Sequence, residues 1–145
     1  MRRLVLVAAV LAAFLVSAAP VAAVGFTAWH ASVSGPVLHG GATVTERPLG
    51  RVRFEVAVHG ALPASRPVME LVNAACGTKG LPLGVARMTP ATKAGWSVGL
   101  EIFSTPQTAI FNAWVKAGKT ISVHVVGRGP NVTLTQSCGV LTKAG

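Results

Sequence analysis

The feature that most constrains the fold of this 145-residue chain is a regular alternation of side chains over residues 51–59. Every second position is apolar, at Val52, Phe54, Val56 and Val58. Successive side chains of a strand point to opposite faces, so this pattern predicts a strand with one face in the core and one in solvent. The second face mixes charges, which is typical of a solvated sheet face; its members are Arg51, Arg53, Glu55 and His59.

Short stretches of the same kind recur about every ten residues, separated by Gly and Pro. They predict strands over 31–37, 42–47, 83–88, 95–103, 108–116, 120–126 and 132–138. We expect the Gly40-Gly41 pair to end the first strand and 83–88 to be an edge strand. In 95–103 the inward side chains would be Trp96, Val98, Leu100 and Ile102. The expected fold is all-β, a single antiparallel β-sandwich of about 7–8 strands covering residues 24–145.

Residues 67–76 fit two kinds of element. Val68, Leu71, Val72 and Ala75 match a helical stripe, with Ser65 as a possible N-cap. The surrounding run of strands favours a strand instead, and we predict a strand here.

The first 23 residues have the organisation of a secretory signal peptide. A short basic start is followed by an unbroken apolar run over 4–16 and a small-residue segment that ends at Ala23. Cleavage after Ala23 would leave no membrane span. The alternative is an uncleaved anchor, because 4–24 is about long enough to cross a bilayer.

Cys76 and Cys138 are the only cysteines. Export to an oxidising compartment predicts a disulfide between them. A zinc site is the weaker alternative, because the chain has no CxxC or HxxxH spacing to complete one.

One stretch resembles a known layout. The residues VRFEVAVHGALPASRPVMELVNAACG, followed by LPLG, resemble exported bacterial β-sandwich modules of immunoglobulin-like shape. The shared order is a Val-rich strand, a Pro-containing turn, an apolar strand that ends at a Cys, and a Leu-Gly segment. The resemblance covers about a quarter of the chain and implies fold and compartment only, since many such modules have no known activity.

The charge balance has two interpretations: contact with anionic partners, or solubility of an exported protein, and the scattered cations favour the second. The chain has 13 Lys and Arg against 4 acidic residues, all Glu, and loss of the leader would leave a net charge of +7. An excess of base favours contact with polyanions such as envelope polymers. The cations are scattered along the sequence and form no cluster, so we expect no specific nucleic-acid site.

The residues do not favour an enzyme. The chain has no Asp for a Ser-His-Asp triad, although Glu can substitute, and it has no GxSxG motif. Its four histidines lack metal-ligand spacing; they are His30, His39, His59 and His124. We therefore predict no catalytic activity, no metal and no cofactor.

Binding is the function that the residues favour. On a strand over 108–116, Trp114 would lie beside Asn112, a typical platform for a sugar or a protein partner. Cationic loop residues would add contacts, at Arg66, Lys79 and Arg128. We expect an exported, non-catalytic β-sandwich that associates with anionic envelope polymers. The alternative is a secreted inhibitor or effector that binds another protein through the Pro-rich loop over 60–67.

Overall fold

The structure is a computed structural model that describes residues 26–47, 49–60, 66–128 and 134–145. The predicted signal peptide, residues 1–23, and most of the Pro-rich loop lie outside these ranges. Within them the elements are β1 (Ala28–Ser34), β2 (Leu38–Glu46), β3 (Val52–Gly60), β4 (Val68–Val72), β5 (Pro82–Arg87), β6 (Trp96–Ile102), α1 (Thr105–Lys116), β7 (Ser122–Arg128), β8 (Leu134–Val140) and β9 (Thr142–Lys143).

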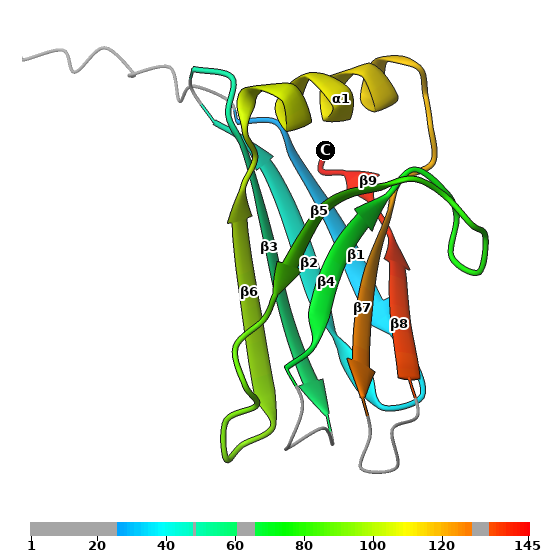
Figure 1. Ribbon diagram of the computed structural model, residues 1–145. Coiled ribbons are helices and arrows are strands. Elements are labelled where there is room, and N and C mark those ends of the chain that lie inside the picture. Colours follow the sequence, from blue (N-terminus) through cyan, green and yellow to red (C-terminus); the bar gives the residue numbers. More distant parts are fainter. Residues whose placement is uncertain (1–25, 48, 61–65, 129–133) are drawn as a thin grey trace, which may run out of the picture.

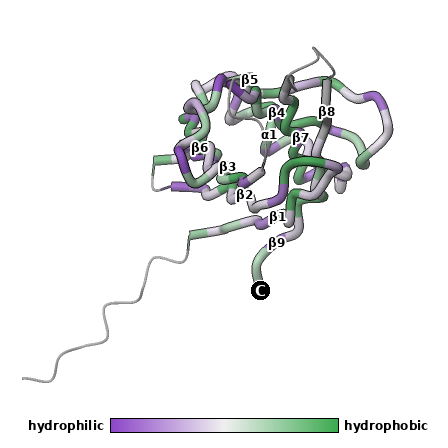
Figure 2. Tube along the Cα trace, turned by 90° about the horizontal axis from the view of Figure 1, so that it is seen from below, coloured by the Kyte–Doolittle hydropathy of each residue, from purple (hydrophilic) through white to green (hydrophobic). Residues whose placement is uncertain are grey.

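The strands form one antiparallel sheet with the order β5-β4-β7-β8-β1-β2-β3-β6, and β9 pairs with β1. The sheet curls until its two end strands, β5 and β6, come near each other, which gives a nearly closed cylinder (Figures 1 and 2). Helix α1 lies across one end of this cylinder (Figure 1). The all-β prediction is confirmed, and β5 is an edge strand as expected.

The core fills the inside of the cylinder. The alternating apolar residues of β3 are buried as predicted, and Met69, Val123 and Val125 join them from β4 and β7. At the helix end, the fully buried Phe111 of α1 packs edge-on against Trp29, with ring centroids 5.1 Å apart. The helix therefore closes the apolar interior at that end.

The prediction of a strand over 108–116 is wrong, because this segment belongs to α1. Ser104 is the N-cap, Pro106 lies in the first turn, and Gln107 at N3 bonds back to the Ser104 backbone N–H at 2.8 Å. This is a capping box, a strong helix-start signal. Thr108 and Phe111, three residues apart, then face the core on one side of the helix.

The Gly40-Gly41 pair does not end a strand but lies inside β2, and the chain turns earlier, between Ser34 and Leu38. A Cβ on Gly40 would overlap the carbonyl oxygen of Ala57 in β3. Glycine is therefore needed here for the close approach of two strands.

The predicted facing of β6 is also wrong. Trp96, Val98, Leu100 and Ile102 point outward and are 46–53% exposed. The inner positions carry Ser97, Gly99 and Glu101, and at Gly99 the side chains of Met69 and Met88 already fill the space. A Cβ on Gly99 would lie only 2.5 Å from the Met69 sulfur.

Two further predictions hold. Residues 68–72 form a strand, β4, rather than a helix. Cys76 and Cys138 form a disulfide, with their Cα atoms 5.8 Å apart.

Candidate functional site

The outer face of β1, β2, β3 and β6 presents four rows of side chains that run across the strands. The strand register defines them as Ser34–His39–His59–Trp96, Ser32–Gly41–Ala57–Val98, His30–Thr43–Glu55–Leu100 and Ala28–Thr45–Arg53–Ile102. We call this surface the outer face. It includes the polar side of β3, which the sequence predicted to be only a solvated surface.

A hollow of about 480 Å³ lies across the middle of the outer face. Its floor is low because Gly41 and Ala57 are small. Thr43, Glu55 and Leu100 border it on one side. A hollow of this size is within the range of ligand and anchor-residue pockets.

Aromatic rings border the outer face at the end of β6. Trp96 is 46% exposed, and its ring lies against His59 with centroids 5.2 Å apart and a tilt of 54°. His39 of β2 is the direct cross-strand neighbour of His59. Trp96 is thus the exposed tryptophan among the described residues, whereas the sequence predicted exposure of Trp114.

The charged groups of the outer face neutralise each other. Arg53 and Glu55 form an ion pair, the only one in the described part of the chain. The remaining members of the four rows carry no Lys, Arg, Asp or Glu. This face therefore has little net charge in an otherwise basic protein.

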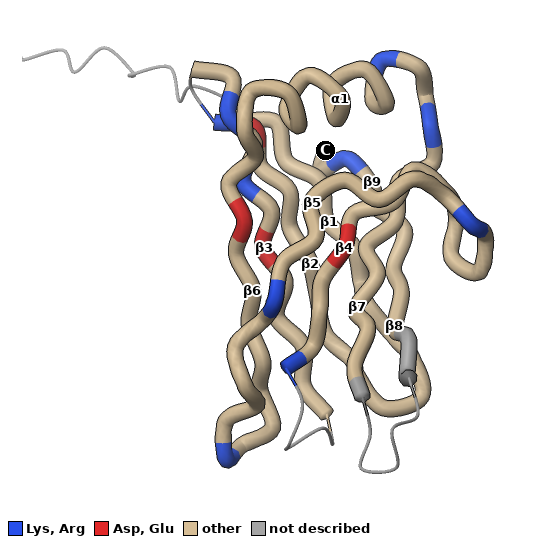
Figure 3. Tube along the Cα trace, viewed as in Figure 1, with Lys and Arg blue, Asp and Glu red and all other residues tan. Residues whose placement is uncertain are grey.

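A second surface, at the helix-covered end, is strongly cationic (Figure 3). Five of the ten Lys and Arg residues whose side chains the structure describes belong to elements that end there. Arg47 follows β2, Arg51 precedes β3, Lys116 ends α1, Lys119 follows α1, and Lys143 lies in β9. We call this surface the cationic end. Two of the four glutamates, Glu46 and Glu101, also belong to it, and Glu101 accepts a hydrogen bond from the Gln107 amide at 3.0 Å.

Within the cationic end, Lys119 and Lys143 border one hollow of about 240 Å³. Lys143 is placed there by β9, because it pairs with Trp29 of β1, and Lys119 follows α1. Apolar groups complete the lining: Trp29, Val115, Ile121 and Leu141. Two ammonium groups beside an apolar wall can hold an anionic group that carries a short hydrocarbon portion.

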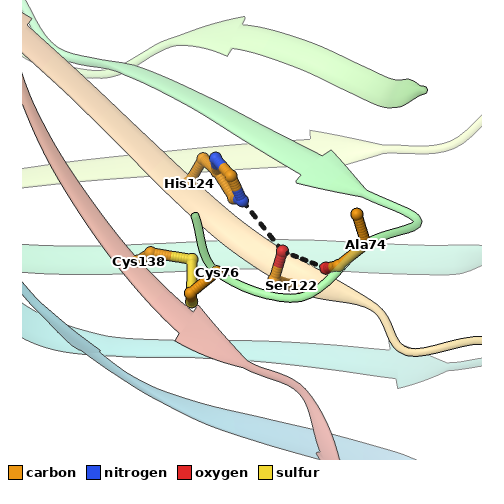
Figure 4. Close-up of a disulfide and its surroundings, with 5 residues drawn as sticks. All are labelled: Ala74, Cys76, Ser122, His124 and Cys138. Carbon is orange, nitrogen blue, oxygen red and sulfur yellow. Dashed lines mark hydrogen bonds between the residues drawn. A yellow bond between two sulfur atoms is a disulfide. The ribbon is translucent and has the colours of Figure 1, made fainter. Parts of the chain in front are cut away.

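A third region is the loop after β4 that carries Ala74 and Cys76, which lies against β7 (Figure 4). Ser122 donates its one hydroxyl proton to the Ala74 carbonyl oxygen at 2.6 Å, so the His124 Nε2, at 2.8 Å, must donate to the Ser122 oxygen. Burial lowers the pKa of His124, and the neighbouring Glu70 carboxylate partly offsets this effect. The fully buried Ser122 of β7 uses its hydroxyl proton in the bond to Ala74, and this hydrogen bond holds the loop on β7.

The residues that the sequence singled out for binding do not come together. Trp114 lies on α1, partly buried against the core, and Asn112 is exposed on the same helix. Arg66 is exposed beside β4, and Lys79 borders a cleft of about 340 Å³ with Glu70 and His124. Arg128 ends β7, and its side chain lies outside the described part of the structure.

Two sets of surface residues were not predicted. The sequence predicted Trp96 to lie in the core. The signal against this was the set of alternate positions, Ser97, Gly99 and Glu101, because a crowded interior can accept small side chains there. Lys119 and Lys143 are 24 positions apart in the sequence, and only the pairing of β9 with β1 places them together.

Comparison with known proteins identifies no relative. No protein-family model, no curated protein and no solved structure matches the chain. Among the described residues, no helix is long and apolar enough to cross a membrane. In the same ranges, no three His, Cys, Asp or Glu side chains form a group that could hold a metal ion.

Proposed function

We propose that this chain is an exported, non-catalytic binding protein that associates with anionic polymers of the cell envelope through its cationic end. The observation that carries the proposal is the convergence of cations that are scattered in the sequence. Lys116 is the last residue of α1, and Lys119 and Lys143 border the hollow that follows the helix. The disulfide supports an extracytoplasmic location, since such bonds persist in oxidising compartments.

The electrostatics of the cationic end suit a polymer better than a single small ion. The five cations are exposed, and in the described part of the chain none of them is ion-paired. Exposed cations spread over one end of a protein can contact successive anionic groups of a chain and release its counterions. If three lysines each neutralise one anionic group, a tenfold rise in salt should weaken binding on the order of 100-fold.

We also predict that the domain is immunoglobulin-like, as its resemblance to exported modules of that shape implies. The antiparallel all-β structure supports it. An immunoglobulin-like sandwich consists of two packed sheets, whereas the strand order β5-β4-β7-β8-β1-β2-β3-β6 is continuous, so this assignment stays a prediction.

The test measures binding to long-chain polyphosphate and to dextran sulfate, with uncharged dextran as the control polymer. The variant Lys116→Gln/Lys119→Gln/Lys143→Gln removes three charges from the cationic end. Its matched control, Arg66→Gln/Lys79→Gln/Lys93→Gln, removes three exposed charges elsewhere. We expect at least a tenfold loss of affinity in the first variant and less than a twofold loss in the second.

Two results would contradict the proposal. Equal losses in both variants would mean that total charge, and not the cationic end, attracts the polymer. If the protein binds neither polyanion but binds a secreted protein in a salt-resistant manner, the alternative of an inhibitor or effector would replace it.

A further inference from the structure

The outer face carries an apolar ridge beside a hollow, and both lie on the same surface. The ridge consists of Trp96, Val98, Leu100 and Ile102 of β6. We infer that this face binds a second copy of the chain, giving a two-fold dimer in which the ridge of each copy lies in the hollow of the other. This inference does not depend on the proposed function, which concerns the cationic end.

The ridge differs from the other exposed apolar residues. Of the eleven large apolar side chains that are exposed among the described residues, these four lie at alternate positions of one strand and share one face. The others are distributed over termini, loops, the helix and other strands. Isolated exposed apolar residues are ordinary, whereas a contiguous row on a sheet face indicates a surface that is covered by a partner.

The charge distribution favours a second copy as the partner. The chain has a net charge of +9, or +7 without the predicted leader, so most approaches of two copies are repulsive. The outer face is the exception, because the Arg53–Glu55 pair is internally neutralised and the four rows contain no other Lys, Arg, Asp or Glu. Two such faces can meet without bringing like charges together.

The shape of the face also meets the requirement of a two-fold contact. In an isologous interface the same patch serves both copies, so it must contain both a projection and its complement. The ridge runs along β6, its Val98 and Leu100 form one wall of the hollow, and the hollow extends from there across Ala57 and Gly41. Sheets that pack with their strands nearly perpendicular would place each ridge along the partner's hollow.

The free edge of β6 is partly occupied by hydrogen bonds within the chain, which favours contact of a partner with the face of the sheet. Thr89 and Thr92 already occupy this edge at two residues: the Thr89 N–H donates to the Val98 carbonyl at 2.8 Å, and the Thr92 N–H donates to the Trp96 carbonyl at 2.8 Å. The Thr89 hydroxyl accepts the Val98 N–H at 3.0 Å. At these two residues the edge cannot pair with another strand. A two-fold contact between faces uses the same patch on both copies, so it closes as a dimer.

The size of the face predicts a reversible dimer. Four strands of about seven residues, at roughly 4.8 Å between strands and 3.3 Å per residue, give on the order of 440 Å² of flat sheet. Two such faces together provide about 900 Å² before side-chain relief, close to the roughly 1,000 Å² that marks biological interfaces.

The test is the molar mass of the protein purified from a producing culture, measured by sedimentation equilibrium from 1 to 200 µM in 0.5 M NaCl. We expect a monomer–dimer equilibrium. Leu100→Glu would place two carboxylates in the contact and raise the dissociation constant at least tenfold. The same substitution at Leu81, which is 68% exposed in a loop, should leave it unchanged.

Gly41→Leu distinguishes a shaped contact from general stickiness. A Cβ at Gly41 meets nothing closer than the Ala31 carbonyl oxygen at 3.7 Å, so the variant should fold. It fills the hollow and should weaken the dimer, although it adds apolar surface. Stronger self-association of this variant, or a monomeric wild-type protein at 200 µM, would overturn the inference. The Lys116→Gln/Lys119→Gln/Lys143→Gln variant should dimerise like the wild type, so failure of the polymer proposal is detected separately.

Discussion

Removal of the disulfide should destabilise the fold by an amount that follows from its place in the chain. The bond joins the loop after β4 to the middle of β8, 62 residues apart, and closes a segment that contains β5, β6, α1 and β7. The chain-entropy relation gives about 14 cal/mol/K for a loop of this length, or about 4 kcal/mol at 25 °C. At about 4 °C per kcal/mol for a domain of this size, the variant Cys76→Ser/Cys138→Ser should melt about 16 °C below the wild type.

The assay is thermal unfolding followed by circular dichroism, with the reduced wild-type protein as a second reference. Cys76 is exposed and Cys138 is half-buried, so the two serines should remove little packing. The variant and the reduced wild type should therefore melt within a few degrees of each other. A melting temperature within about 3 °C of the oxidised wild type would refute the reasoning. It would show that the Ser122–Ala74 hydrogen bond and the strand pairing hold the loop without the covalent link.

Two further predictions concern stability. Gly40→Ala should destabilise the protein by about 1–3 kcal/mol because its Cβ overlaps the Ala57 carbonyl oxygen. Gly41→Ala should change stability by less than about 0.5 kcal/mol, since its Cβ meets no close atom. Urea titration compares the two variants, and equal effects would contradict the close approach of β2 to β3. Because the pKa of His124 is lowered in the folded state, the unfolded chain takes up its proton first as pH falls below about 6.5, and stability present above that pH should decline. His124→Gln should make the decline between pH 7 and pH 5 shallower, and an unchanged slope would mean that other groups cause it.

The strands could be predicted because their signal is local. Alternation in 52–58 and the glycines and prolines between strands depend on neighbouring residues only, and the observed β3 matches the expected core face. The helix could also have been found in the sequence. Ser104, Pro106 and Gln107 are a helix-start signal, but the apolar residues of 108–116 also fit a strand, and the surrounding β pattern determined the interpretation.

The apolar ridge of the outer face could not be predicted because it depends on which face of β6 points inward, and the cationic end could not because it depends on the pairing of β9 with β1. Alternation in the sequence shows that the two faces of a strand differ. It does not show which face is buried, because that depends on the side chains that neighbouring elements place in the core. Here Met69 and Met88 fill the interior beside Gly99, and Ser97 and Glu101 find polar partners at Thr89 and Gln107. The inner positions of β6 are thus occupied without large apolar side chains, and one carboxylate oxygen of Glu101 is buried without a hydrogen-bond partner. The larger apolar side chains of β6 lie on the outside. A contiguous apolar row on an outer sheet face is typical of a surface that a partner covers, and this leads from the packing of β6 to the proposed dimer.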